Sequence, residues 1–391
     1  MNTNKYYLLI VIILMVSLGA VLTTHRALSS PTLTIHVNGQ TIKTVASNPA
    51  SQDELMIPEA VAEKALNTRI GWQKLGPLPK GIYFRDEVAV LMYHHLSEKP
   101  MPLFPWVLSA DRFEDQMKLL KQEGFHVITM EQYREFMLSN GTVPDNAVLL
   151  TFDDGYESFY KLAFPILKKY GYTAANFIIV STIDHLDRNG LPKLTWEQMR
   201  EMKRYGMQFY NHTYDLHHYA IVDAEGGERP AASSLLYIDD ENRNELNSEY
   251  YSRVTHDLAK AEQRLKEELG NTDSAIAFPF GSYNDKLLNV CKSLGISLTF
   301  KIEDGINTRM DRNAYRINAG SELPTSRMTV EQLKHFDLPM ELTLNNQRAE
   351  LIRRSPKRGG LMVPINQLCK DLHIDMKYDP KRRIATLTKS E

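Results

Sequence analysis

The sequence is poor in cysteine and has no excess of charge of either sign. Its 391 residues include only two cysteines, Cys291 and Cys369, which excludes a small domain held together by disulfides and a zinc site built from cysteines. A disulfide between Cys291 and Cys369 is one alternative, and two free buried thiols are the favoured one. The 46 basic and 48 acidic residues give a formal net charge of −2, so no basic excess indicates a nucleic-acid partner. With 43% hydrophobic and 24% charged residues, the composition also excludes a disordered or multi-span membrane protein and predicts two or three globular domains.

Long hydrophobic runs are absent except at the N-terminus. No charged side chain lies between Lys5 and His25, and a largely apolar run of about 20 residues is long enough to cross a bilayer. Residues 1–28 are therefore predicted to be a membrane anchor or a signal segment. An uncleaved single-pass anchor is favoured because no small-residue cleavage site follows directly, while a cleaved signal and a buried core helix are the alternatives. Either an anchor or a signal places the rest of the chain outside the cytoplasm, at the cell membrane or secreted.

The two ends of the chain share a pattern of hydrophobic strands. Residues 33–45 alternate apolar and polar side chains around Asn38-Gly39, a pair typical of a hairpin turn. The segment Leu55-Met56-Ile57-Pro58 then precedes a helical pattern, and Leu361-Met362-Val363-Pro364 does the same near the other end. We predict an internal repeat of a small α+β module, with two unrelated β-rich flanks as the alternative. The predicted modules cover residues 31–75 and 340–391.

Between the flanks, apolar strands alternate with amphipathic helices. Residues 111–123 form one such helix, with Phe113, Met117 and Leu120 at helical spacing. This alternation predicts an α/β domain with a parallel sheet or barrel over residues 86–335. Polar residues at the carboxyl ends of its strands are the candidates for a site, because those ends gather on one face. The predicted strands are residues 88–93, 147–152, 174–180, 274–278 and 297–300.

Two adjacent carboxylates end one of these strands. Asp153 and Asp154 follow the run 147–152 and precede Gly155. Two carboxylates at a strand end are costly unless they are paired, hydrogen-bonded or bound to a metal. Strand alternation sends their side chains in different directions, so each can have a different role. An ordinary Asp-Gly turn is the alternative.

Three further strand ends carry polar or turn residues. His212, His217 and His218 follow another short apolar run, and two histidines with a carboxylate are typical of a catalytic metal with an open position. The strand 88–93 is followed by His94, which we expect on the same face; a surface histidine is the alternative. The strand 274–278 ends in the turn Pro279-Phe280-Gly281, whose backbone N–H can point at a ligand as an oxyanion donor does.

Together, these residues resemble the motifs of the polysaccharide deacetylases, also known as NodB-homology or carbohydrate esterase family four enzymes. Thr151-Phe152-Asp153-Asp154-Gly155 resembles the first motif, His212-Thr213 with a second histidine resembles the second, and Pro279-Phe280-Gly281 resembles the third. The resemblance spans roughly residues 86–320. It implies a distorted (β/α) barrel of the polysaccharide deacetylase type.

The resemblance also implies a role for each residue of the site. Asp153 is expected to be the catalytic base. Asp154, His212 and His217 are expected to bind a divalent metal, with the adjacent His218 as an alternative to His217. Zn²⁺ is favoured, and such a ligand set also tolerates Co²⁺, Ni²⁺ or Fe²⁺.

The pattern departs from the family at two positions. Ala275 stands where the family often has an arginine, four residues before the proline of the third motif. The family also commonly has a Leu-x-His catalytic acid near the end of the domain, whereas His335 lies in a charged helical pattern. In the branch that acts on biofilm poly-N-acetylglucosamine, the acid instead lies in an N-terminal Tyr-His motif, which Tyr93-His94 resembles. The resemblance therefore assigns His94 as the catalytic acid.

Further residues resemble the same branch. The five-residue step from His212 to His217 is found there, and Arg316 is a candidate partner for the base. Pro279 and Phe280 are the candidates for binding the substrate and its oxyanion through the backbone.

The function implied is extracytoplasmic, metal-dependent de-N-acetylation of an N-acetylglucosamine polymer, either an exopolysaccharide or peptidoglycan. A non-catalytic glycan-binding protein of the cell wall and an amidase acting on another acylated substrate are the alternatives. The sequence contains no His-Glu-x-x-His motif, which argues against a metallopeptidase. The expected partners are the polymer and, through the N-terminal segment, the membrane; the oligomeric state is open.

Other features extend this reading. The two flanks loosely resemble stalk domains of the copper amine oxidase N-terminal type, without a copper-ligand cluster. The polar, acidic segment 220–249 is predicted to be a surface insertion near the site. Four aromatic residues are candidates either for stacking on sugar rings or for core packing: Trp196, Tyr214, Tyr219 and Tyr283.

Overall fold

The computed structural model of the chain divides into two compact units, Ile70–Pro356 and a smaller unit that combines Met1–Arg69 with Lys357–Glu391. The predicted membrane segment, residues 1–28, lies outside the described part of the chain. Within the described part, no helix has the length and apolar character needed to cross a bilayer. The described residues are 32–45, 55–74, 78–186, 190–309, 311–323, 325–335, 340–344, 347–354, 362–379 and 382–389.

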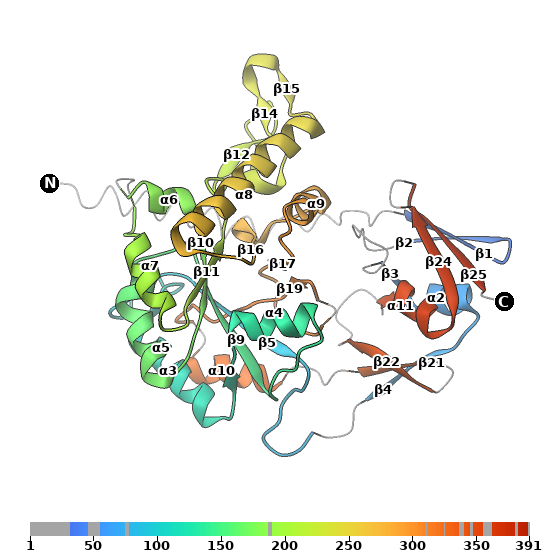
Figure 1. Ribbon diagram of the computed structural model, residues 1–391, viewed down its shortest axis with the longest axis horizontal. Coiled ribbons are helices and arrows are strands. Elements are labelled where there is room, and N and C mark those ends of the chain that lie inside the picture. The colour runs from blue at the N-terminus through green and yellow to red at the C-terminus, as the bar shows by residue number, and fades with distance from the viewer. Residues whose placement is uncertain are drawn as a thin grey trace. The chain divides into compact units, whose positions relative to one another are not determined.

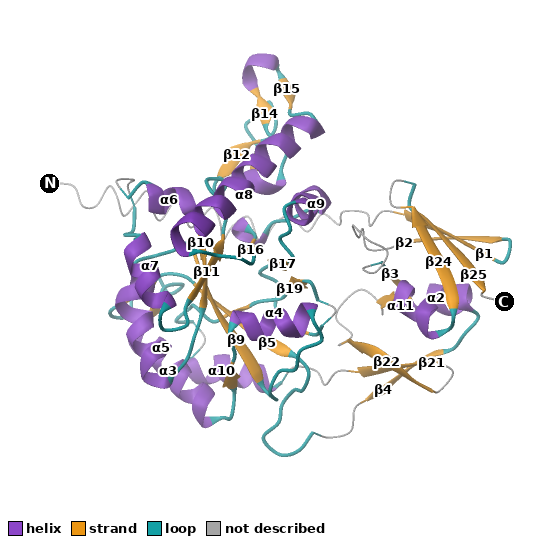
Figure 2. Ribbon diagram, viewed as in Figure 1, coloured by secondary structure: helices purple, strands orange, loops and turns teal. Residues whose placement is uncertain are grey.

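The larger unit is organised around one mostly parallel sheet, with helices on its outside (Figures 1 and 2). In order across the sheet, the strands are β18 (Ile306–Asn307), β5 (Val88–Tyr93), β9 (Ala147–Asp153), β10 (Ala175–Ile178), β11 (Gln208–Asn211), β16 (Ala275–Ala277), β17 (Leu298–Phe300) and β19 (Asn313–Ala314). Two further strands, β8 (His126–Val127) and β20 (Ile317–Asn318), pair with β9 and β5. The helices are α3 (Ala110–Gln122), α4 (Met130–Leu138), α5 (Phe164–Tyr170), α6 (Val180–Asp184), α7 (Trp196–Lys203), α8 (Asn247–Leu269), α9 (Asp285–Ser293) and α10 (Ser326–Lys334).

The last two strands bring the opposite edges of this sheet together. β19 pairs with β17, whereas β20 pairs in parallel with β5. Only Tyr315 and Arg316 separate the two strands, so the chain crosses directly from one edge to the other. The sheet is therefore a nearly closed α/β barrel, in agreement with the predicted fold class.

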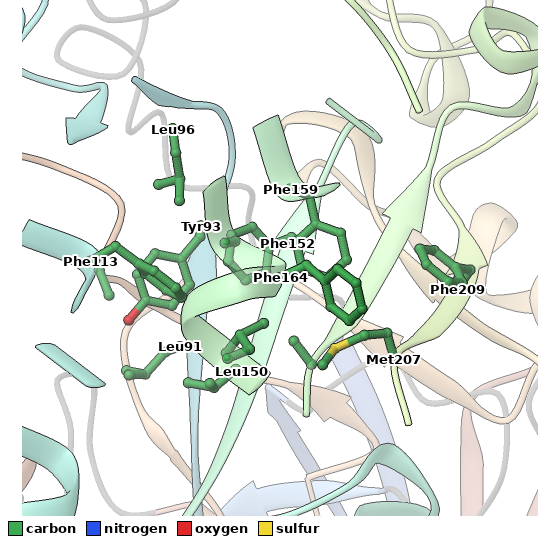
Figure 3. Close-up of a cluster of buried hydrophobic side chains, with 14 of the residues drawn as sticks. Leu91, Tyr93, Leu96, Phe113, Leu150, Phe152, Phe159, Phe164, Met207 and Phe209 are labelled. Carbon is green, nitrogen blue, oxygen red and sulfur yellow. The ribbon is translucent and has the colours of Figure 1, made fainter. Parts of the chain in front are cut away.

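The two faces of the strands are buried against different partners. In β5 and β9, Leu91, Tyr93, Leu150 and Phe152 pack against the outer helices, and the alternate residues form a second cluster that includes side chains of α4. Figure 3 shows the outer layer, where Phe113 of α3 lies beside these aromatic side chains. The helical spacing of Phe113, Met117 and Leu120 is confirmed, since all three are fully buried. Burying a large apolar side chain completely stabilises a fold by about 1.5–3 kcal/mol.

The smaller unit contains a hairpin made by β1 (Thr32–Val37) and β2 (Gln40–Val45). Asn38 and Gly39 form its turn with φ values of +48° and +74°, as the Asn-Gly pair predicts. In the same sheet, β1 pairs in parallel with β25 (Ile384–Lys389), which pairs with β24 (Ile374–Asp379).

The matching segments at the two ends also pair with each other. β3 (Met56–Pro58) is antiparallel to β23 (Met362–Pro364), with Ile57 opposite Val363. Each is followed by a helix, α2 (Glu59–Leu66) or α11 (Ile365–Asp371). The order of hairpin, strand, helix and strand thus recurs, since β21 (Met340–Leu344) and β22 (Gln347–Arg354) form the second hairpin.

The two predicted modules, residues 31–75 and 340–391, pair their strands with each other. Strands from both ends share sheets in the smaller unit, and β4 (Ile70–Lys74) pairs with β21 in a three-stranded sheet that belongs to the larger unit. A segment of about 40 residues buries too little surface to be stable alone. The unpaired edges of its strands are satisfied by strands from the other end of the chain.

The predicted surface insertion forms two small hairpins that precede α8. They are β12 (Tyr219–Ile221) with β13 (Glu228–Pro230), and β14 (Tyr237–Ile238) with β15 (Arg243–Asn244). Short strands at β6 (Leu96–Ser97) and β7 (Leu108–Ser109) complete the larger unit. Cys291 and Cys369 are both buried and free, so the disulfide alternative is excluded.

Candidate active site

The predicted site residues come together at the carboxyl ends of β5, β9, β11 and β16, where parallel strands end at one edge. Three of the loops there hold a non-glycine residue in the left-handed backbone region. Its φ value is +73° at Asp154, +73° at Thr213 and +57° at Phe280. Each such residue costs about 1–3 kcal/mol and persists only where its surroundings hold it. Left-handed residues of this kind cluster at functional sites.

Asp154, His212 and His217 form the group that could hold a metal ion. One ligand atom from each lies within 4.8 Å of the others, and both histidine Nε2 atoms are 3.4 Å from Asp154 Oδ1. This carboxylate oxygen is buried without a hydrogen-bond partner. A buried, unsatisfied carboxylate oxygen facing two imidazole nitrogens fits a divalent cation.

The protonation of the histidines agrees with a role as ligands. His212 Nδ1 is 2.8 Å from the carbonyl oxygen of Ala277, so it carries the proton and leaves Nε2 free to bind a metal. Burial lowers the pKa of His217 to about 4, which keeps its ring neutral near pH 7. Burial raises the pKa of Asp154, but His217 and His212 outweigh this effect and the pKa lies well below its ordinary value. All three groups are therefore in the state that a cation requires.

The structure distinguishes His217 from His218. His217 belongs to the cluster and packs against Phe280, with ring centroids 4.5 Å apart. The exposed His218 instead donates from Nδ1 to the carbonyl oxygen of Asp215 at 3.0 Å. The five-residue step from His212 is the one that reaches Asp154.

Asp153 is held by a buried arginine rather than by the metal group. The guanidinium of Arg316 donates to both carboxylate oxygens, at 2.7 and 2.8 Å, and its Nε donates to the carbonyl oxygen of Lys301. Burial raises the pKa of Asp153, but Arg316, with His212 and His94 in support, lowers it below the ordinary value. Arg316 thus supplies the cation that the resemblance expects at position 275.

His94 lies at the open side of this pair. Its Nε2 is 3.9 Å from Asp153 Oδ2, and 43% of its side chain is exposed. A half-exposed imidazole next to a fixed carboxylate can exchange a proton with a bound molecule. His335, by contrast, is exposed on a helix end beside Glu331 and away from this group.

The Pro279-Phe280-Gly281 turn forms the wall next to His217. Phe280 packs on one side against His217 and on the other against Tyr219, with ring centroids 4.6 Å apart in the second pair. The insertion is tied to this turn, because Ser233 and Ser282 share a hydrogen bond of 2.7 Å.

The four aromatic candidates for sugar stacking separate in the structure. Tyr219 is next to Phe280, whereas Trp196 donates to Asp184 and packs into the core. Tyr214 lies under Lys260, and Tyr283 stacks on Phe278. Of these residues, Tyr219 alone contacts a side chain assigned to the site.

A second layer of residues around Asp154 was not predicted. Lys193 donates to the backbone carbonyl oxygen of Asp154 at 2.8 Å, and burial together with the nearby Asp154 carboxylate raises the pKa of the Tyr156 phenol. His95 packs edge-on against Tyr156 with centroids 5.4 Å apart and hydrogen-bonds Ser158. The position of Tyr156 directly after the Asp-Asp-Gly motif is a signal for its role. Lys193 offers no such signal, since it is distant in sequence.

Known proteins resemble this chain over part of its length. Residues 140–299 match the family model described as polysaccharide deacetylase. The chain is 29% identical over 231 residues to the poly-β-1,6-N-acetyl-D-glucosamine N-deacetylase of Escherichia coli (strain K12), a match that covers 56% of this chain and 34% of that protein. It therefore spans about a third of the length of this relative.

Two further relatives extend the comparison. The poly-β-1,6-N-acetyl-D-glucosamine N-deacetylase of Staphylococcus aureus (strain N315) is 26% identical over 251 residues, covering 61% of this chain and 80% of that protein. The solved structure of a de-N-acetylase from Aggregatibacter actinomycetemcomitans superposes with a TM-score of 0.58 at 28% identity, covering 63% of this chain and 99% of that one.

Proposed function

The chain contains a polysaccharide deacetylase domain, and we propose that this domain hydrolyses the acetamide groups of poly-β-1,6-N-acetylglucosamine with the help of a divalent metal. The observation that carries the proposal is the pairing of two separate groups at one sheet edge. Asp154 with His212 and His217 forms a cation site, and Asp153 is held beside it by Arg316. The polymer is inferred from the names of the Escherichia coli and Staphylococcus aureus relatives.

Zn²⁺ is the proposed metal, since two imidazole nitrogens and one carboxylate oxygen with an open position are typical of catalytic zinc. Co²⁺, Ni²⁺ and Fe²⁺ suit the same ligands. When bound, the ion would polarise the acetamide carbonyl and lower the pKa of water.

The chain's own residues would divide the remaining work. Asp153 stays ionised beside Arg316, so it can accept a proton from the attacking water as general base. Because Arg316 holds both oxygens, the carboxylate keeps one orientation. His94 lies on the exposed side of Asp153 and would donate a proton to the leaving amine. A backbone N–H near Phe280 would stabilise the oxyanion.

The place of action is proposed from the hydrophobic N-terminal run. Residues 1–28 would anchor the chain in the cell membrane as a single span, with the deacetylase domain outside the cytoplasm. The alternative is a cleaved signal that leads to secretion. N-terminal sequencing of the mature protein distinguishes this signal from an uncleaved anchor.

Acetate release tests the activity. The full chain, kept in detergent, is incubated with poly-β-1,6-N-acetylglucosamine or with peptidoglycan, with and without a chelator, beside the Asp153→Asn variant. We expect acetate from the first polymer, lost with chelator and in the variant. Release that survives the chelator overturns metal dependence, and release from peptidoglycan alone overturns the proposed substrate. No release from either polymer by chain with metal verified as bound overturns the proposed activity.

A further inference from the structure

Two short segments far apart in the sequence pair directly behind Asp154. Tyr156 and Lys193 face each other in an isolated antiparallel bridge. The backbone N–H of Glu157 donates to Pro192, and that of Leu194 donates to Gly155, each at 2.9 Å. This ladder fixes the loop after β9 to the chain that leads into α7. It brings a lysine and a tyrosine against the same aspartate.

Both side chains lie next to Asp154. Lys193 Nζ donates to the backbone carbonyl oxygen at 2.8 Å. Burial and the nearby Asp154 carboxylate raise the pKa of the Tyr156 phenol. The lysine therefore holds Asp154 through its backbone and leaves Oδ1, the carboxylate oxygen that faces both histidines, without a hydrogen-bond partner.

The lysine is itself fixed by the tyrosine. Its ammonium lies 3.8 Å from the centroid of the Tyr156 ring, a cation–π contact. His95 packs on the same ring from another segment. A partly buried ammonium is costly unless its hydrogens are used, and here the ring and the Asp154 carbonyl use them. The hydrogen bond falls on the residue whose φ value is +73°.

We propose that Lys193, held by the ring of Tyr156, is a positioning residue that keeps Asp154 in its metal-binding conformation. The proposal rests on the metal site of the proposed function. Lys193 sets the backbone conformation that presents the carboxylate, and the Tyr156 ring sets the position of Lys193. Outer partners of metal ligands commonly change metal affinity by about 10–100-fold when they are removed.

Co²⁺ binding to the metal-free full chain tests the idea without relying on turnover. The visible absorption of Co²⁺ reports the geometry of its ligands, and titration reports its affinity. The variants are Tyr156→Leu, which removes the ring beside the ammonium, and Lys193→Met, with Lys193→Arg as the conservative change. Lys168→Met is the matched control, because Lys168 lies 4.1 Å over the ring of Tyr205 in the same type of contact.

We expect Tyr156→Leu and Lys193→Met to bind Co²⁺ about 10–100-fold more weakly and with a changed spectrum. Lys168→Met should match the wild type, and Lys193→Arg should recover most of the affinity. Wild-type affinity and spectrum in both test variants overturn this proposal alone. A wild-type chain that binds no Co²⁺ overturns the proposed metal site with it. If Tyr156→Leu fails to fold, the comparison of Lys193→Met with Lys193→Arg still decides the outcome.

Discussion

The larger unit is one continuous stretch of chain, whereas the smaller unit joins segments from opposite ends of the sequence. In the larger unit, each strand of the barrel is followed by its own loop, so the metal-binding residues lie next to the strands that position them. In the smaller unit, β1 pairs with β25, which lies more than 300 residues away along the chain. The comparison teaches that local spacing is a guide to a site on successive strands, but not to a sheet built from both termini.

The same contrast exists within the active site. Asp154, His212 and His217 follow their strands directly, whereas the partner of Asp153 comes from the segment between β19 and β20 that closes the barrel. The ligand group is thus determined locally, and the environment of the base depends on closure. The following predictions test both parts of this contrast, from the largest expected effect to the smallest.

The strongest test compares two neighbouring histidines. We expect His217→Ala to lower deacetylase activity by more than ~100-fold, because it removes one of the three proposed metal ligands. This loss is larger than the 10–100-fold loss that is typical when an outer partner of a ligand is removed. The activity of His218→Ala should stay within about twofold of the wild type, since the described hydrogen bond of the His218 ring is to the backbone carbonyl oxygen of Asp215. The rates of acetate release and the bound metal content measure the difference. Equal losses in the two variants would contradict the assignment.

The second test opens the barrel closure at Arg316. Arg316→Met leaves the buried carboxylate of Asp153 without its cation, so we expect the free energy of unfolding to fall by about 3–5 kcal/mol. Urea unfolding of the larger unit measures this change. The double variant Arg316→Met with Asp153→Leu is the control, since it removes the unpaired charge and should regain part of the stability. A loss below 1 kcal/mol in the single variant would show that the pair does not stabilise the closure.

The third test separates the two units. Deleting residues 357–391 removes β23, β24 and β25, which leaves the β1–β2 hairpin without the rest of its sheet. An isolated hairpin is at best marginally stable, so we expect amide hydrogens in residues 32–45 to lose their protection from exchange. Protection in β5 and β9 should persist. Mass spectrometry of exchanged peptides gives both results, and retained protection in the hairpin would show that the shared sheet is not required.

The smallest effect concerns a carboxylate in the helical layer. Asp184 accepts from Trp196 and from Arg264. Burial raises its pKa, but these partners outweigh burial and the pKa lies below its ordinary value of 3.8. Because the folded-state pKa is lowered, its contribution is present above about pH 4 and is lost as the pH falls through the folded-state pKa.

Asp184→Asn should therefore lower the free energy of unfolding by about 1–2 kcal/mol at pH 7, with a smaller difference from the wild type near pH 3. Unfolding curves at the two pH values measure it. A difference that grows toward low pH would reverse the assigned direction of the pKa shift.

Several features of the molecule could be predicted from local pattern. The alternation of apolar strands and helices predicted the α/β barrel, because each β-α unit buries its own apolar faces. The Asn38-Gly39 turn, the buried face of α3 and the free cysteines followed from residue type and spacing. The grouping of Asp154 with His212 and His217 could be predicted because parallel strands end at one edge.

Other features could not be predicted in this way. The flanks were predicted as two modules, and the structure joins their strands in shared sheets. Lys193 reaches Asp154 through a ladder between segments that have no common pattern. A resemblance indicated Arg316, but no spacing places its guanidinium on Asp153, because that contact needs the closed barrel.

By itself, the sequence determined which residue types end each strand, and therefore which ligands are available for a metal. Only the tertiary structure decided how the base and the ligands are supported, through Arg316 on Asp153 and Lys193 on Asp154. The physical reason is that strand periodicity and turn preference act between neighbours in the chain. Pairing of buried charges and closure of a sheet depend on distances in space, which are fixed only when the whole unit has folded.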